Sequence, residues 1–165
     1  MTAAKLQKEP NKVQNLVTET PEHTVRSFLF WYSKNIQRLN TIQLVNQQQA
    51  PTKPYYVNNA NVTLYLAELK KSGYLSTIFL NSIEQYISIC KTNLLKIKQT
   101  EGPPEGFDMD MILFTQDYES NLKLLNKGTI IRLTKNKVRF TFASKDFLVF
   151  GLSERKGKWF IDSIE

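Results

Sequence analysis

Five acidic residues and no basic residue lie between positions 101 and 118 of a chain that elsewhere has an excess of lysine and arginine. Three of the five, Asp108, Asp110 and Asp117, surround a short apolar run in the stretch GFDMDMILFTQDY. Carboxylates at such spacing can bind a metal ion, exchange protons with a substrate, or accept hydrogen bonds from the backbone of their own loop. The residues between the acids favour one of these three roles.

Asp108 and Asp110 are the candidates for a metal site, because Asp-x-Asp resembles the start of a calcium loop. The next four positions hold Met, Ile, Leu and Phe, where a calcium loop needs polar ligands and a glycine. We therefore favour a structural role, in which Asp108 or Asp110 accepts hydrogen bonds from local backbone N–H groups. Ile112 and Phe114 would then insert into the core. Acid–base catalysis by a pair of these carboxylates stays open, because it requires environments that separate their pKa values.

Three further residues with potentially reactive side chains are best explained structurally. Asp117 is placed to cap a helical turn that begins near Tyr118. Cys90, the sole cysteine, falls within the apolar stripe of a predicted helix, so we interpret it as a buried thiol and not as a nucleophile. His23, the sole histidine, lies in the first turn of a helix, where the helix dipole disfavours its charged form. A capping or surface role is therefore expected for it.

Basic residues cluster on predicted strands near the C-terminal end. The chain has 22 Lys and Arg against 15 Asp and Glu, a formal net charge of +7 that attracts anions. A turn at Lys135 and Asn136 would place Arg132 directly opposite Arg139, with Lys137 beside them. Two facing arginines either extend into solvent, which is the usual role of surface charge, or share an anion. Arg132, Lys137 and Arg139 are the candidates for an anion site.

Apolar residues at helical spacing predict three helices before residue 101. The first begins at the N-cap Thr20, the second is capped by Asn61 and ends at Gly73, and the third and longest begins near Ser76. A polar stretch with prolines at residues 46–54 predicts a loop, and EGPPEG at 101–106 ends the third helix. The predicted apolar faces are Val25, Phe28, Leu29, Tyr32, Ile36 and Leu39; Val62, Tyr65, Leu66 and Leu69; and Phe79, Ile83, Tyr86, Ile87, Cys90, Leu94 and Ile97.

From residue 129 onward apolar residues alternate, which predicts antiparallel strands. With the turn at 135–136, Leu133 faces Val138 and Ile131 faces Phe140. The segment DFLVFGLSE, residues 146–154, is apolar on both faces and predicts a strand covered on both sides. Helices cover one side, and a second copy of the chain is the simplest cover for the other. A last hairpin with Gly157 in its loop follows.

Helices followed by antiparallel strands predict an α+β fold. We expect a mobile tail at residues 1–19 and a single domain at residues 20–165, because 165 residues with 41% hydrophobic composition suffice for one continuous core. No segment reaches the roughly 18 continuous apolar residues that a membrane span requires, and the first residues lack the apolar core of a signal segment.

Four segments together resemble a bacterial family known as domain of unknown function 3828: FLFWY, YLAELKKSGYLS, DMDMILFTQDY and GKWFIDSIE. The resemblance extends over roughly residues 20–165. It implies the cone-shaped, cystatin-like α+β fold of nuclear transport factor 2, in which N-terminal helices pack in the concave face of a curved C-terminal sheet. It also implies a periplasmic or cell-envelope protein, often a lipoprotein, although this chain starts without a signal segment or lipid-bearing cysteine. No catalytic residues come with the family.

We therefore expect a non-enzymatic binding module that has no cofactor. Either a pocket inside the cone takes a small apolar ligand, or the sheet takes a protein partner from the envelope or a second copy of the chain. The predicted pocket is aromatic and consists of Phe28, Trp31, Tyr32, Tyr86 and Phe140.

Two alternatives belong to other classes of function. Enzymes of the resembling fold use a buried Asp and a Tyr, which makes Asp162 with Tyr32 or Tyr86 the catalytic candidates of an isomerase or hydrolase. A three-residue loop at 155–157 turns Asp162 outward and a two-residue loop turns it inward, and the sequence is compatible with both. Nucleic-acid binding through the basic strands is the third alternative, and an exported location disfavours it.

Overall fold

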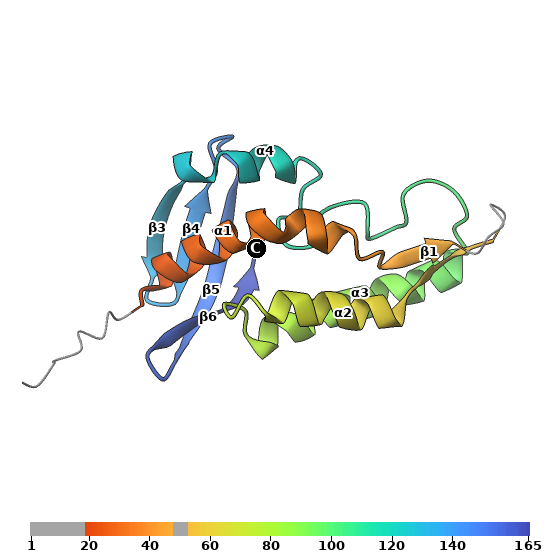
Figure 1. The fold of residues 1–165 in the computed structure, drawn as a ribbon, viewed down its shortest axis with the longest axis horizontal. Coiled ribbons are helices and arrows are strands. Elements are labelled where there is room, and N and C mark those ends of the chain that lie inside the picture. Colours follow the sequence, from red (N-terminus) through yellow and green to blue (C-terminus); the bar gives the residue numbers. More distant parts are fainter. Residues whose placement is uncertain (1–18, 48–52) are drawn as a thin grey trace, which may run out of the picture.

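The computed structural model describes residues 19–47 and 53–165. The predicted mobile tail at residues 1–19 lies, except for residue 19, outside the described residues, as does most of the predicted loop at 46–54. Figure 1 shows the elements in chain order. They are α1 (Pro21–Asn40), β1 (Val45–Gln47), β2 (Tyr55–Val57), α2 (Asn59–Lys70), α3 (Thr77–Ile97), α4 (Tyr118–Lys123), the 3₁₀-helix η1 (Leu125–Lys127), β3 (Thr129–Thr134), β4 (Lys137–Thr141), β5 (Phe147–Arg155) and β6 (Lys158–Ile164).

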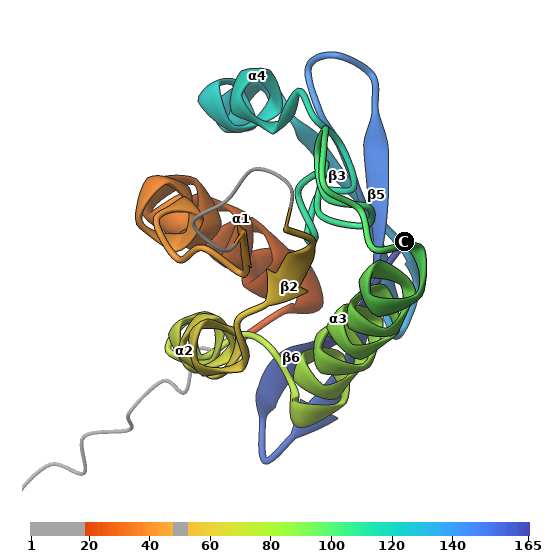
Figure 2. The same ribbon diagram turned by 90° about the vertical axis from the view of Figure 1, so that its right-hand side faces the viewer.

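Helices pack against one antiparallel sheet, so the predicted α+β class is confirmed. Strands β3, β4, β5 and β6 are hydrogen-bonded in sequence order. Helix α1 contacts β3, β4 and β6, and α3 contacts β6. Figure 2 shows α1, α2 and α4 on the same side of β5. A separate two-stranded ribbon pairs β1 with β2. The predicted loop at 46–54 therefore overlaps the end of β1 and is followed directly by β2.

Helix α1 forms as its sequence predicts. The side chain of Thr20 accepts a hydrogen bond from the backbone N–H of His23, and Pro21 occupies the first helical position, where its missing N–H is not needed. His23 itself is exposed and its ring lies 3.3 Å from the hydroxyl of Ser27. All six predicted apolar positions of this helix are buried: Val25, Phe28, Leu29, Tyr32, Ile36 and Leu39.

The next two helices differ from prediction in detail. Asn58 rather than Asn61 caps α2, because the side chain of Asn61 donates instead to the backbone oxygen of Gln43. Ser76 caps α3 as predicted. Five of the seven predicted apolar residues of α3 are buried, whereas Tyr86 is 41% exposed and Ile97 is 52% exposed. Tyr86 lies at the margin of the stripe, and Ile97 is the last residue of the helix.

The predicted register between β3 and β4 is wrong. Arg132 pairs with Val138, and Ile131 rather than Arg132 pairs with Arg139. A register shift between Arg132 and Thr134 inserts one extra residue into β3. Each residue of β3 before the shift therefore pairs with the β4 residue one position earlier than predicted. The two arginines therefore do not face each other, and Arg132 forms an ion pair with Glu22 of α1 instead.

The last hairpin resolves the alternative that the sequence left open. Lys156 and Gly157 form a two-residue turn, both with positive φ (54° and 79°), between the paired residues 155 and 158. The expected consequence, Asp162 facing inward, is nevertheless wrong. The two-residue turn pairs Ile161 with Leu152, and both are buried, so the core face of β5 carries Leu152 and the neighbouring Asp162 lies on the other face. A register shift at Asp162 then returns Ile164 to the core face.

The acidic segment packs closely against the middle of α3. The hydroxyl of Tyr86 donates to the backbone oxygen of Gly106 at 2.9 Å. Gly106 has φ of +83°, and a Cβ atom there would lie 2.4 Å from the Sγ atom of Cys90. Cys90 is buried, as predicted, and burial raises the pKa of its thiol. The thiol therefore packs against the loop at Gly106.

We expect Gly106→Ala to lower the free energy of unfolding by about 2–4 kcal/mol, measured by urea denaturation. About 1 kcal/mol comes from placing a side chain at positive φ and the remainder from overpacking against Cys90. Gly157→Ala is the matched control, because Gly157 has a similar φ of +79° but no atom within 4 Å of an added Cβ. Equal losses for the two variants would show that the loop does not contact α3 this closely.

Candidate functional site

The carboxylate of Asp110 joins the acidic segment to α1. One oxygen, Oδ1, accepts hydrogen bonds from the backbone N–H groups of Ile112 (2.9 Å) and Leu113 (2.7 Å). The other oxygen, Oδ2, accepts from the hydroxyl of Tyr32 at 2.7 Å. The structural role predicted for this acid is thus confirmed. Ile112 is fully buried as expected, but Phe114 is 50% exposed, which corrects its predicted place in the core.

The exposure of Phe114 follows from the tight turn that Asp110 closes. Its backbone N–H donates to the carbonyl oxygen of Asp110 at 2.9 Å, and its φ is +53°. A bulky side chain rarely adopts this conformation, and here it directs the ring away from the core. The turn that places Asp110 therefore determines which neighbouring apolar residue is left outside.

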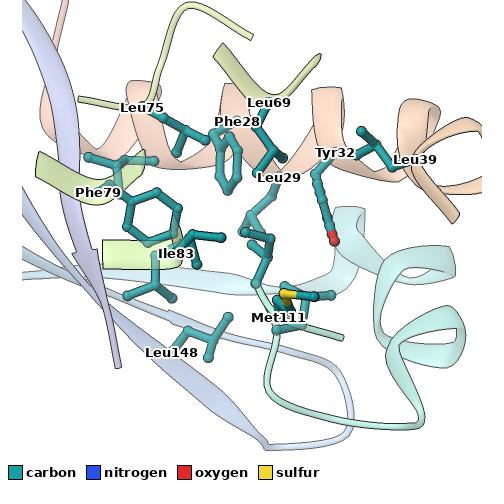
Figure 3. Close-up of a cluster of buried hydrophobic side chains, with 14 of the residues drawn as sticks. Phe28, Leu29, Tyr32, Leu39, Leu69, Leu75, Phe79, Ile83, Met111 and Leu148 are labelled. Carbon is teal, nitrogen blue, oxygen red and sulfur yellow. The ribbon is translucent and has the colours of Figure 1, made fainter. Parts of the chain in front are cut away.

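Two buried tyrosines interact with the carboxylate of Asp110. Tyr32 is fully buried on α1, and Tyr65 of α2, also buried, interacts electrostatically with Tyr32 and with Asp110. Burial, together with the negative charge of Asp110, raises the pKa of both phenols above the ordinary value. Both tyrosines therefore stay protonated at neutral pH. Figure 3 shows Tyr32 extending from α1 toward the segment that carries Met111.

Asp110 and Tyr65 also line a cavity of about 280 Å³. It lies between the end of α1, the segment leading into β1, helix α2 and the acidic segment. Most of its lining is apolar, with two amide side chains among the lining residues. The lining consists of Leu39, Asn40, Ile42, Gln43, Leu44, Val45, Tyr65, Pro104, Phe107, Asp110 and Met111.

Burial and hydrogen bonding act in opposite directions on the carboxyl group of Asp110. Burial raises its pKa, while the bonds from Tyr32, Leu113 and Ile112 lower it, and the effect of burial is the larger. None of the ion pairs within the described residues involves Asp110. Three acceptor positions of the carboxylate are occupied, which leaves about one for a further donor.

The other acids of the segment do not join this site. Asp108 is exposed. Asp117 precedes α4, as predicted, but its side chain makes no capping hydrogen bond. Within residues 19–47 and 53–165, no group of three His, Cys, Asp or Glu side chains is arranged to hold a metal ion. Asp108 and Asp110 thus have no third ligand among the described residues.

The structure does not pair Asp162 with either of its candidate tyrosines, Tyr32 and Tyr86. Asp162 lies on β6, with its Oδ1 atom 3.8 Å from Nη2 of Arg155, and not beside either candidate tyrosine. Tyr32 is bonded to Asp110, and Tyr86 to Gly106. Burial raises the pKa of Tyr86 to about 12. Asp110 with Tyr32 is the Asp–Tyr pair that the structure contains, and it is not the pair that the sequence suggested.

The predicted aromatic pocket is filled core. Phe28, Tyr32 and Phe140 have at most 1% of their surface exposed, so they pack against other side chains and do not line an open space. Trp31 is partly buried against the same core and stacks with Phe28 at 6.3 Å between ring centres. Tyr86 lies apart on α3 and is exposed.

The candidate anion site is not assembled by the fold. Arg132 is paired with Glu22. Arg139 lies over the ring of Phe147, with its guanidinium carbon 5.7 Å from the ring centre. Because Arg132 and Arg139 are paired with adjacent residues of the partner strands, their side chains point to opposite faces of the sheet.

Sequence reasoning missed Tyr65 and the cavity. Tyr65 was recognised only as part of an apolar helical face, and its position is buried as that face requires. The available signal was chemical: a tyrosine within an apolar stripe carries a hydroxyl that needs a buried partner. That signal shows that a partner is needed, but it does not identify which residue the partner is.

Comparisons of the chain with protein-family models, with curated proteins and with solved structures each find no match. The motifs that resemble a known family therefore receive no support from these comparisons, and they give no family assignment. Among the described residues, no helix is both long enough and apolar enough to cross a membrane.

We expect Asp110→Ala to lower the free energy of unfolding by roughly 3 kcal/mol, because it leaves two backbone N–H groups and one buried hydroxyl without an acceptor. The measurement is equilibrium denaturation in urea. Asp108→Ala is the matched control, and because Asp108 is exposed its effect should stay within about 0.5 kcal/mol. Similar effects for both variants would contradict the role of Asp110 in holding the segment.

Proposed function

We propose that the protein is a non-enzymatic binding module whose cavity beside Asp110 holds a small, largely apolar molecule. The observation that carries this proposal is the cavity of about 280 Å³, whose mostly apolar lining contains two amide side chains and a single carboxylate. Sites for small molecules combine apolar walls with a few polar groups that fix orientation. The volume lies just below the roughly 300–1,000 Å³ of sites for drug-sized ligands, so the ligand is smaller than those.

The chemistry of the site supports binding over catalysis. Asp110 holds three hydrogen bonds that maintain the fold, so its protonation would weaken the segment that forms the cavity. Tyr32 and Tyr65 have raised pKa values and serve as donors, not as bases. The sole cysteine and the sole histidine are not among the residues that line the cavity.

Two finer features remain part of this proposal. From the resemblance of its motifs, we propose that the sheet curves around α1 as in the cone of nuclear transport factor 2. The contacts of α1 with β3, β4 and β6 support that arrangement. A place in the periplasm or cell envelope stays a prediction that rests on the same resemblance alone.

We expect small amphipathic compounds to bind the protein and to raise its melting temperature in a thermal-shift screen, with about 2.7 kcal/mol of added stability at 100 times Kd. Native mass spectrometry of the protein purified without chelators then identifies any compound that is retained from the cell. Ile42→Trp should weaken binding by about tenfold or more, because the larger ring fills the cavity that Ile42 lines.

Ile89→Trp is the control, since Ile89 is 61% exposed on α3 and does not line the cavity. This variant should bind every active compound as the unmodified protein does. A screen without any binding compound would contradict the proposed function. Compounds that bind Ile42→Trp with unchanged affinity would show that the binding site lies elsewhere.

We further propose that a second copy of the chain covers the face of the sheet turned away from α1, here called the outer face. It carries the exposed apolar side chains of Ile131 and Phe147. Arg139, Val149 and Glu165 form one row across it, because Arg139 pairs with Val149 and Val149 exchanges two backbone hydrogen bonds with Glu165. This row has a positive end, an apolar centre and a negative end.

Such a row is complementary to itself. A two-fold axis that runs parallel to β5 between two outer faces brings Arg139 of each copy opposite Glu165 of the other, with Val149 at the centre. The Nε atom of Arg139 is buried and has no hydrogen-bond partner among the described residues. Glu165 is exposed and makes no ion pair among those residues. Each group thus lacks the partner that the other copy would supply.

We expect a dimer in sedimentation equilibrium. Arg139→Glu and Glu165→Arg should each weaken it by about tenfold or more, because like charges then face each other, and the double variant should restore it. Ile89→Lys on α3 is the control that should leave it unchanged. A monomeric protein, or single variants that are not rescued by the double variant, would contradict this arrangement.

A further inference from the structure

The charge of Asp110 is not neutralised by any cation among the described residues. Its carboxylate takes part in none of the ion pairs there, and its three partners are two backbone N–H groups and one phenol. Burying a carboxylate without a counter-ion is costly, and the raised pKa of Asp110 reflects that cost. The site is therefore arranged so that a cation beside Asp110 would be stabilised.

The surroundings of the cavity favour an organic cation over a metal ion. Tyr65 and Phe107 contribute aromatic rings to the lining, and Leu39, Leu44 and Met111 contribute aliphatic surface. A metal ion such as calcium would need several oxygen ligands, and no group of three suitable acids is present among the described residues. Aromatic rings beside a carboxylate are instead suited to alkylated ammonium groups, which are attracted to ring faces.

The local charge distribution also favours a cation. The protein as a whole is basic, yet residues 101–118 contain five acids and no basic residue. Pro104, Phe107, Asp110 and Met111 of this segment form one wall of the cavity. Exposed acids such as Asp108 and Glu105 lie next to that wall in sequence and add to the negative charge of this segment.

We propose, on the basis of the binding function proposed above, that the ligand is a small organic ammonium ion. Its positive nitrogen lies beside the carboxylate of Asp110, and its carbon groups contact the rings of Tyr65 and Phe107. The carboxylate keeps its three hydrogen bonds to the protein and supplies charge to the ligand. Neutral and anionic molecules of the same size bind more weakly.

Choline and 3,3-dimethylbutan-1-ol test this inference, because they have the same shape and differ in the charge of one atom. Isothermal titration of the full chain should show choline binding at least about tenfold more tightly than the alcohol. Asp110→Asn should reduce the affinity for choline to about that for the alcohol, while Asp108→Asn, two residues away and exposed, should leave both affinities unchanged.

Phe107→Leu provides a second variant, because Asp110 also supports the fold. It should weaken choline binding by about threefold and leave the alcohol unaffected, since only the cation gains from the aromatic face. Equal or tighter binding of the alcohol would overturn the ammonium assignment and leave the binding function standing. Failure of both probes would also overturn the assignment, and the screen with Ile42→Trp then decides the binding function separately.

Discussion

The carboxylate of Asp110 is the constraint on which the cavity depends. It lies in a segment without helix or strand, between the end of α3 and the start of α4. The carboxylate accepts hydrogen bonds from two backbone N–H groups of this segment and from the hydroxyl of Tyr32, and it thereby fixes the segment to α1. Tyr65 of α2 lines the cavity together with this carboxylate. The hydrogen bonds of one carboxylate thus position both a cavity wall and its polar group, which explains why an acid is tolerated at a half-buried position.

The sheet supports this arrangement from the opposite end of α1. The ion pair between Glu22 and Arg132 fixes the first turn of the helix to the edge strand β3, while the buried residues between the two ends pack on β4 and β6. Two irregularities make that packing possible. The register shift near Leu133 places Arg132 on the face toward α1, and the one at Asp162 lets Ile161 and Ile164 face the core together. Each extra residue is local, but it decides which side chains reach the helix.

Periodic features were predictable from the sequence, and features that depend on distant partners were not. The extent and buried face of α1, the cap Ser76 and the order of the strands follow from spacing and local hydrogen bonding, which neighbouring residues determine. The extra residue at Asp162 left a readable sign, because Ile161 and Ile164 are three positions apart where alternation requires two. The pairing of Tyr32 with Asp110 left no such sign in the sequence. It joins residues 78 positions apart, and several acids of the segment were equally suitable by type.

The long sequence separation of these contacts also determines when the site can form. Asp110 follows Tyr32 by 78 residues, and Arg132 follows Glu22 by 110. Closing such long loops costs entropy before the contacts can compensate, so folding is expected to be slow relative to that of helical proteins of the same length. During synthesis α1 emerges before the strands of the sheet, so its apolar face lacks that cover until the strands follow. For that interval the helix that later holds the binding site is the part of the nascent chain most in need of protection from aggregation.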